Sequence, residues 1–438
     1  MSDFTSHPSY NARYKIGEGY IGFCSNTLKV NTISFQPRGV GKNEDRVVTK
    51  LWHFNNQRWM FLAVFDGHLG STTAEYTSLT LPDALYEKLR EFIQNIGGRL
   101  DRSNIATHQA QVSKLLKNEI EAFDKHLGDA VRQLCPRPED LTEEQARRLI
   151  DRHKDILERA FYGTTMVFAL INPDQRFMWA AGVGDSSVGL SYIGMDGRPK
   201  GQRLCKMHTF KDPQEYFNAS MAHPATEQPL FDWEDRILGW QTIARGTVSL
   251  DRCWLIPPDM LASAIGNFAM KLPAPYFANL FKYLPGLERF CFDTIISKIK
   301  TPPYIVCSPS VRFMDLQPVW RPDSKIFLFT DGVDNLVDGW VVFKPRQHSG
   351  ADPIDVVSAL LANPIEPRIA QILGHPVIPR WSGPENNRAT DVLGNLLGGT
   401  DIERLEAVTD LERLNDEKSA WPFYIDDTSI IVWRFTTK

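Results

Sequence analysis

Acidic residues in this chain stand where apolar stretches end. Residues 61–70 read Phe-Leu-Ala-Val-Phe-Asp-Gly-His-Leu-Gly, an apolar run that stops at Asp66, and the design recurs where Phe-Leu-Phe-Thr leads to Asp331 and Gly332. An apolar strand that ends in an acid followed by glycine holds a carboxylate at a rigid sheet edge, and the glycine, which has no Cβ, leaves bare backbone beside it. We therefore expect these two carboxylates to bind a hard metal ion.

Four more acids stand in comparable places. Glu44 and Asp45 precede a predicted strand, Asp185 lies in the tight turn Gly-Asp-Ser, and Asp426 precedes a run rich in Ile and Val. Each acid taken alone has an ordinary explanation, such as a solvated turn or, for Asp66, the N-cap of a following helix. Acids at the ends of several separate strands are harder to explain as unrelated surface charges.

The chemistry that these residues favour is hydrolysis of a phosphate ester. Oxygen ligands without a histidine or cysteine cluster are the preference of Mg²⁺ and Mn²⁺. Two such ions about 3.5–4 Å apart can share a water, lower its pKa and direct it at phosphorus. His68, with an ordinary pKa near 6.5, could donate a proton to the leaving alkoxide, although a lone histidine at a helix entry is more often an ordinary polar residue.

The elements that must position these acids alternate between blocks of strands and blocks of helices. Apolar β-branched and aromatic runs predict strands at 59–66, 163–171, 176–192, 325–331 and 429–435. Turn signals at 172–175 and 195–198 predict an antiparallel meander over 163–205. Apolar periodicity predicts helices at 72–98, 108–134, 142–160, 353–362 and 386–398. Thr142 and Gln145 have the spacing of a capping box, and the grouping of helices between strand blocks indicates an α+β fold.

The composition narrows the class of protein. The 438 residues are 42% hydrophobic and carry a net charge of −4, which argues against binding to nucleic acid or to anionic lipid. Six scattered cysteines form no CxxC pair, so we expect reduced thiols in an intracellular protein. No stretch approaches the roughly 20 apolar residues of a membrane span, and the first residues lack the pattern of a secretory signal. The cytoplasm or nucleus is the expected location.

Six segments, taken in order, resemble the metal-dependent protein phosphatase 2C (PPM-type) family. They are Asn43-Glu44-Asp45-Arg46, Val64-Phe65-Asp66-Gly67-His68-Leu69-Gly70, Gly163-Thr164-Thr165, Gly184-Asp185-Ser186, Thr330-Asp331-Gly332 and Asp426-Asp427-Thr428-Ser429. The resemblance runs from about residue 30 to residue 436. Residues 261–268, 301–304, 387–390 and 403–405 are similar to the pyruvate dehydrogenase phosphatase branch, and mitochondrial residence would fit that branch.

The resemblance implies a fold and a role for each acid. The fold is a central antiparallel β-sandwich flanked by helices, with a metal pair at one end. By position, Asp66 would bridge both ions; Glu44 and the Gly67 carbonyl would hold one, and Asp331 and Asp426 the other. Asp45 would bind metal-bound water, His68 would be the general acid, and Asp185 would serve a third ion.

The resemblance also implies a domain layout. Residues 1–29 would be an N-terminal extension and 30–436 a single catalytic domain. We expect residues 206–324, which contain several tryptophans and prolines, to be an ordered insertion over one end of the sheet, with a separate small domain as the alternative.

Four positions depart from the family pattern. Arg38 lies seven residues before Asp45, where the phosphate-binding arginine is usually five before it, and Lys42 is nearer; we favour Arg38 because guanidinium offers a fork of donors to phosphate. Ser187 stands in place of an arginine, Asn267 in place of an aspartate, and Asn335 in place of an acid. These departures bear on the third ion and on substrate selectivity.

We therefore expect a Mg²⁺- or Mn²⁺-dependent phosphatase that acts on phosphoserine and phosphothreonine in proteins. One alternative is a phosphatase-shaped scaffold that binds phosphoproteins without turnover, and another is an enzyme for a small phosphorylated metabolite. The sequence indicates neither the particular phosphoprotein nor the oligomeric state.

Overall fold

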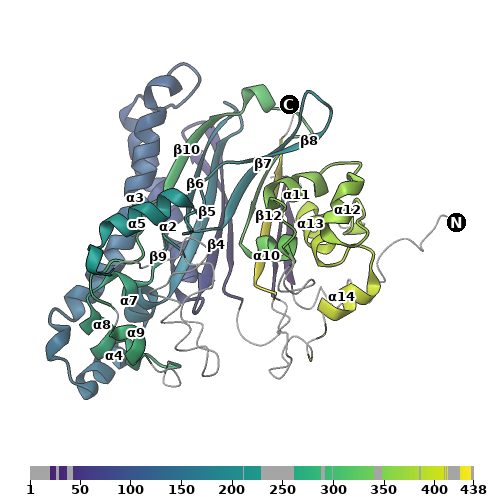
Figure 1. The fold of residues 1–438 in the computed structure, drawn as a ribbon. Helices are drawn as coiled ribbons and strands as arrows, with labels where there is room; N and C mark the ends of the chain where they lie inside the picture. The colour runs from purple at the N-terminus through teal and green to yellow at the C-terminus, as the bar shows by residue number, and fades with distance from the viewer. Residues whose placement is uncertain are drawn as a thin grey trace.

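The computed structural model describes most of the chain. The described residues are 20–25, 29–36, 43–210, 212–227, 261–287, 292–297, 299–339, 348–383, 386–408, 410, 412 and 425–435. Two six-stranded sheets face each other at the centre, with helices on both outer faces (Figure 1). The expected α+β fold, an antiparallel β-sandwich flanked by helices, is confirmed.

The first sheet has the strand order β1-β2-β12-β11-β7-β8, and the second has the order β10-β6-β5-β4-β3 with β9 paired to β5. The neighbouring strands in the described part of both sheets pair antiparallel. The bounds are β1 (Tyr20–Ser25), β2 (Val30–Phe35), β3 (Arg46–Phe54), β4 (Gln57–His68), β5 (Gly163–Asn172), β6 (Phe177–Val183), β7 (Ser187–Ile193), β8 (Pro199–Arg203), β9 (Ile265–Gly266), β10 (Ser310–Asp315), β11 (Lys325–Phe329) and β12 (Thr428–Arg434).

Different helices cover the two outer faces. Helices α2, α3 and α4 lie on the side of the second sheet, and α10, α11 and α13 lie on the side of the first (Figure 1). The helix bounds are α2 (Thr72–Asn95), α3 (Ile105–Leu134), α4 (Glu143–Phe161), α5 (Pro213–Ala222), α7 (Phe268–Lys271), α8 (Ala274–Asn279), α9 (Asp293–Ile296), α10 (Gly332–Asp338), α11 (Pro353–Leu360), α12 (Pro367–Leu373), α13 (Arg388–Leu397) and α14 (Ile402–Val408). Short 3₁₀ turns occur at η2 (Pro138–Asp140), η3 (Ala225–Glu227), η4 (Phe281–Tyr283) and η5 (Gln317–Val319).

The period of two along each strand sends alternate side chains into different cores. In β4, Phe61 and Phe65 face the helices α2 to α4, whereas Leu62 and Val64 face the opposite sheet. Strands β11 and β12 divide their side chains in the same way between the inter-sheet core and the α10 to α13 side. A strand buried on both faces reads as a continuous apolar run, which explains why residues 59–65 are all apolar.

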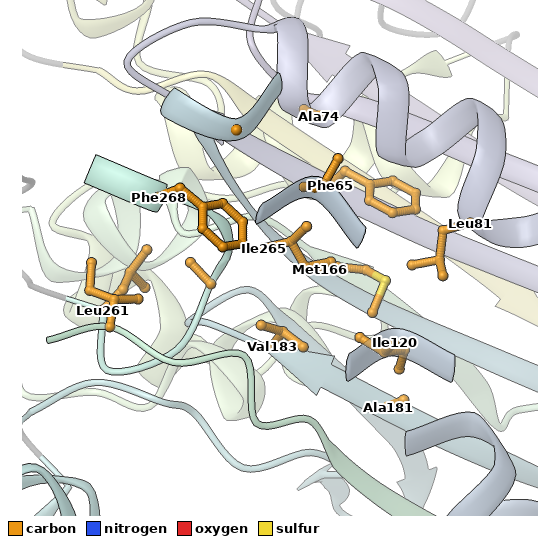
Figure 2. Close-up of a cluster of buried hydrophobic side chains, with 14 of the residues drawn as sticks. Phe65, Ala74, Leu81, Ile120, Met166, Ala181, Val183, Leu261, Ile265 and Phe268 are labelled. Carbon is orange, nitrogen blue, oxygen red and sulfur yellow. The ribbon is translucent and has the colours of Figure 1, made fainter. Parts of the chain in front are cut away.

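The core beneath α2 and α3 extends to the β9–α7 segment. Phe65 and Met166 of the central strands belong to one buried cluster with Leu81 of α2, Ile120 of α3 and Phe268 (Figure 2). Gly128 of α3 makes room for this phenylalanine, since a Cβ at residue 128 would lie 2.1 Å from the Phe268 ring. The β9–α7 segment is therefore anchored on α3 and, through the pairing of β9, on β5.

Most expected elements are present with shifted ends. The strands expected at 59–66 and 163–171 are β4 and β5, and those at 325–331 and 429–435 are β11 and β12. The five expected helices correspond to α2, α3, α4, α11 and α13. The capping box at the start of α4 is confirmed, because Thr142 Oγ1 accepts from Gln145 N and Gln145 Oε1 accepts from Thr142 N.

The expectation of one meander over 163–205 is wrong. Strands β5 and β6 pair in one sheet and β7 and β8 in the other, so the expected strand 176–192 is two strands separated by the turn at residues 184–186. Gly184, at φ 93°, allows the sharp turn by which the chain crosses between sheets. Local turn signals indicated each hairpin correctly but carried no information about which sheet would accept it.

The expected domain layout stays a prediction, and two facts bear on it. Strand β1 lies inside the segment expected as an extension and pairs with β2. Strands β9 and β10 lie inside the segment expected as an insertion and pair with β5 and β6. Among the described helices, none combines the length and the apolar character that a membrane crossing requires.

Candidate active site

Strand register brings the predicted acids to one end of the sandwich. Arg46 of β3 is opposite Phe65 of β4, so Glu44 and Asp45 lie beside Asp66. In the other sheet, Phe329 of β11 is opposite both Ser187 of β7 and Ile430 of β12. Asp331 therefore follows its strand at the edge where Asp185 and Asp426 precede theirs. Antiparallel pairing therefore places three predicted residues at the end of each sheet, and the packing of the sheets brings the six together.

Hydrogen bonds join the two sheets at this end. The Glu44 N–H donates to Asp427 Oδ2 at 2.6 Å, across 383 residues of sequence. Thr330 Oγ1 donates to Asp45 Oδ2 at 2.9 Å and accepts from Ser429 N at 2.9 Å. Asp45 is 3% exposed, and its Oδ1 has no hydrogen-bond partner among the described residues. A buried carboxylate oxygen without a hydrogen-bond partner lowers the stability of the fold unless a cation or a water bound to it satisfies the oxygen.

The cluster is strongly acidic, and its members raise one another's pKa values. Burial raises the pKa of Asp66 well above its ordinary range, and the charge of Asp331 adds to the effect. Burial and the charge of Asp426 raise the pKa of Asp331, although a hydrogen bond with Asp66 partly offsets this. Burial and the charge of Asp427 raise the pKa of Glu44 to about 7. Such mutual repulsion is the signature of carboxylates that share a site, and a bound cation would relieve it.

Gly67 is needed because the two acidic segments approach each other closely. A Cβ at residue 67 would lie 2.6 Å from the Glu44 carbonyl oxygen and 3.1 Å from Ala74 Cβ. The neighbouring Thr164 Oγ1 donates to the Asp66 carbonyl at 2.9 Å, which holds the end of β4 against β5. The glycine after Asp66 therefore allows the backbone that carries Glu44 to pass over the strand end.

Asp185 lies in the turn that crosses between the sheets. His208 holds this turn on both sides of Gly184: the His208 N–H donates to the Gly184 carbonyl at 2.8 Å, and Gly184 N–H donates to His208 Nδ1 at 3.2 Å. Asp185 is 7% exposed, and its charge raises the pKa values of Asp66 and Asp331. Asp185, the residue expected to serve a third ion, therefore belongs electrostatically to the acid cluster.

His68 points to a different partner. Its Nε2 lies 2.7 Å from Asn267 Oδ1, on the segment between β9 and α7. Burial lowers the pKa of His68 to about 4, and the charge of Lys271 contributes to the lowering. An imidazole next to the acid cluster is therefore kept neutral by its surroundings.

The structure brings together Glu44, Asp45, Asp66, Asp185, Asp331 and Asp426, with Gly67 and His68 beside them. Arg38 and its rival Lys42 lie outside the described residues. Sequence reasoning gave no separate role to Asp427, Thr330 or Asn267, although each belongs to a segment already singled out. The signal for Asp427 was the doubled acid at 426–427, whose second member binds the Glu44 backbone.

The donor set fits divalent cations that prefer oxygen. Among the described residues, no three His, Cys, Asp or Glu side chains are placed to hold one ion by themselves as they stand. Mg²⁺ rarely needs such a set, because it keeps several waters and is usually held by one or two carboxylates. The unsatisfied Asp45 oxygen and the raised carboxylate pKa values support a fit to hydrated divalent ions.

The fold and the site define a helix-flanked β-sandwich with a carboxylate cluster at the strand ends. The model of the protein phosphatase 2C family matches residues 39–240, which include Glu44, Asp66 and Asp185. Over this segment the chain is similar to the protein phosphatase 2C family, whose members are metal-dependent protein phosphatases. The resemblance seen in the motifs is thus confirmed, whereas the pyruvate dehydrogenase phosphatase branch has no support from the comparisons.

Three solved structures show a more distant likeness. A serine-threonine phosphatase 2C from Toxoplasma gondii is 12% identical over 95% of this chain and 99% of its own, with a TM-score of 0.49. A C. elegans sex determining protein is 14% identical over 93% and 65%, with a TM-score of 0.42. A bacterial serine phosphatase with one substitution is 11% identical over 94% and 99%, with a TM-score of 0.40. Likenesses this weak support no argument about function. No curated protein matches the chain significantly.

Proposed function

We propose that this protein removes phosphate from phosphoserine and phosphothreonine side chains of other proteins, with Mg²⁺ or Mn²⁺ bound by the acid cluster. The observation that carries the proposal is the convergence of Glu44, Asp66, Asp331 and Asp426 from four separate segments at one end of the sandwich. The family match over residues 39–240 supports the same reaction.

Each acid has a proposed place in the site. Asp66 would contact two ions, with Glu44 and the Gly67 carbonyl on one side and Asp331 and Asp426 on the other. Asp185 would serve a third, weaker position, and Asp45 would accept a hydrogen bond from a water at the ions. When bound, the ions would supply charge neutralisation for the phosphate and a lowered pKa for an attacking water.

The chain itself would handle the remaining proton and the orientation of the substrate. Cleavage of the ester leaves an alkoxide that must gain a proton, and His68, the last residue of β4, could supply one after taking up a second proton on Nδ1. Arg38 remains our proposed phosphate ligand because a guanidinium group matches phosphate oxygens with paired donors. No cysteine is required, because water is the nucleophile.

The test is release of phosphate from a phosphothreonine peptide. The purified protein should turn over with Mn²⁺ and stop when a chelator is added. Asp66→Asn should lower kcat by at least about a thousandfold, because an oxyanion-stabilising centre of this kind supplies several kcal/mol to the transition state. Asp323→Asn, in the exposed turn before β11, is a matched control that should leave kcat unchanged. Absence of turnover with either ion in a folded sample would reject the proposal.

The scaffold alternative deserves one direct comparison, because no three of the described side chains are placed to hold an ion by themselves. Calorimetry with Mn²⁺ separates the two hypotheses. Binding of two ions that Asp66→Asn abolishes favours the enzyme. Binding of a phosphopeptide with neither ion binding nor turnover favours the scaffold.

A further inference from the structure

The hydrogen bond between His68 and Asn267 joins the site to a segment about 200 residues further along the chain. His68 Nε2 and Asn267 Oδ1 are 2.7 Å apart. An amide oxygen can only accept, so this geometry requires the proton to be on Nε2 and leaves Nδ1 as the nitrogen available for other contacts. Asn267 is 6% exposed, which protects the bond from competing water.

Gly163 makes room for this pair. A Cβ at residue 163 would lie 1.9 Å from His68 Nε2 and 2.1 Å from Asn267 Oδ1. Gly163 pairs with both His68 of β4 and Gly266 of β9, so the histidine and the asparagine approach each other over the same glycine. Any side chain at residue 163 would push His68 and Asn267 apart, which explains the glycine at the start of the Gly-Thr-Thr segment.

The backbone of Asn267 is held in an unusual conformation. Its φ of 56° and ψ of 37° lie in the left-handed region, which asparagine adopts more readily than most residues. The Asn267 N–H donates to the Tyr162 carbonyl at 2.9 Å, next to Gly163. The amide side chain is thus aimed at His68 by its own backbone.

A buried ion pair fixes the same turn from the other side. Lys271 Nζ donates to Asp124 Oδ1 and Oδ2 at 2.8 and 2.9 Å and to the Ala264 carbonyl at 2.8 Å. Asp124 Oδ1 also accepts from Gly266 N at 2.8 Å, directly before Asn267. The side chains of Lys271 and Asp124 are 6% and 9% exposed, so this anchor between α3 and the β9–α7 segment is shielded from solvent.

We infer that Asn267 is a positioning residue for His68: its amide oxygen accepts from Nε2–H and fixes the ring orientation, so that the proton passed to the leaving alkoxide is a second one carried on Nδ1 and the ring returns to its Nε2–H form. The inference deepens the proposed function and rests on it. It also gives a role to a position where the family pattern has an aspartate. An asparagine there supplies the same acceptor geometry without a second buried negative charge next to the acid cluster.

The test compares two leaving groups. Hydrolysis of a phosphothreonine peptide releases the threonine side chain as an alkoxide, which must gain a proton. Hydrolysis of para-nitrophenyl phosphate releases para-nitrophenolate, a good leaving group that hardly needs one. Asn267→Gly keeps the left-handed backbone and removes the amide, and Asn267→Asp keeps both the backbone and the acceptor. Asn267→Gly should lower kcat on the peptide by about 10- to 100-fold, the scale on which general acids and their supporting partners act, and change para-nitrophenyl phosphate turnover by less than about threefold. Asn267→Asp should recover most of the peptide activity.

Two further variants make the test specific. Gly163→Ala should reproduce the Asn267→Gly pattern, because it separates the same two atoms. In a His68→Ala background, Asn267→Gly should have no further effect on the peptide, since residues that act through one group are not additive. An equal loss on both substrates, or an additive loss in the double variant, would overturn the inference.

A readout without turnover separates this inference from the proposed function. Nuclear magnetic resonance of the imidazole nitrogens reports which one carries the proton. The wild type should show the Nε2–H tautomer, and Asn267→Gly should lose that preference. If the wild type hydrolyses neither substrate, the proposed function fails; an unchanged His68 tautomer in Asn267→Gly would independently end the positioning role.

Discussion

Two buried groups of charge in this molecule are built in opposite ways. On the first sheet's outer side, Asp391 of α13 is satisfied internally: Oδ2 accepts from Arg388 Nη1 at 2.7 Å, and Oδ1 accepts from Ser382 N and Oγ, both at 2.7 Å. At the strand ends, the partly buried Asp66 and Asp331 have other carboxylates as their main electrostatic neighbours. The first arrangement is complete without a ligand, whereas the second leaves negative charge that calls for external cations.

The comparison teaches how to distinguish a structural charge from a functional one. Arg388 also donates Nη2 to the Leu361 carbonyl at 2.8 Å, and Asn387 beside it donates to the Thr32 carbonyl at 3.1 Å, so the first group ties α13 to its surroundings. The carboxylates of the acid cluster instead raise one another's pKa values. Their repulsion lowers the free energy of unfolding at neutral pH, and a bound cation would compensate for this loss.

The largest expected effect on stability comes from breaking the complete group. Arg388→Met should lower the free energy of unfolding by about 3–5 kcal/mol, because it leaves the Asp391 carboxylate, 1% exposed, without its cation. Urea denaturation measures this loss. The control is Arg148→Met, which removes an ion pair with Glu144 whose side chains are 59% and 79% exposed and should cost less than about 1 kcal/mol. Similar losses for both variants would refute the contrast.

A smaller effect is expected from the acid cluster, and it depends on pH. The pKa of Glu44 is raised from 4.5 to about 7, so the folded protein binds this proton more tightly than the unfolded chain. Its contribution to stability is therefore fully present below about pH 4.5 and is lost as the pH rises through about 7. In the presence of a chelator, the free energy of unfolding should fall between pH 5 and 7.5 by about 1–3 kcal/mol less in Glu44→Gln than in the wild type.

Paired urea titrations of the wild type and Glu44→Gln at the two pH values measure that difference. Saturating Mn²⁺ should reduce it, since a cation favours the ionised carboxylates. A pH dependence identical in the two proteins would show that Glu44 does not carry the repulsion.

The smallest effect is expected at Ser187, the position where the family pattern has an arginine. Arg203 of β8 donates to Ser187 Oγ and pairs with Asp352 at 2.9 Å. Ser187→Ala should cost at most about 1 kcal/mol of stability and leave kcat unchanged, because Arg203 keeps its carboxylate partner. Thermal unfolding and peptide turnover check the two parts, and a loss of turnover beyond about threefold would place Ser187 in the site.

Local patterns predicted much of the fold. The capping box at Thr142 and the apolar runs of β4 and β11 specify their elements within a few residues, because helix caps and strand periodicity act over short distances. The acids at Asp66 and Asp331 were found for the same reason: each lies within two residues of the end of its strand. The crossing at Gly184 was missed because sheet choice depends on which apolar face meets which core.

The sequence by itself determined which acids lie near strand ends and could ligate an ion, and that a glycine follows Asp66. Only the tertiary structure decided that Asp427 binds the Glu44 backbone and that Asn267 reaches His68 over Gly163. The physical reason is range. Residue type and periodicity act over a few positions, whereas these hydrogen bonds join segments 383 and 199 residues apart and exist only once the sheets have paired and packed.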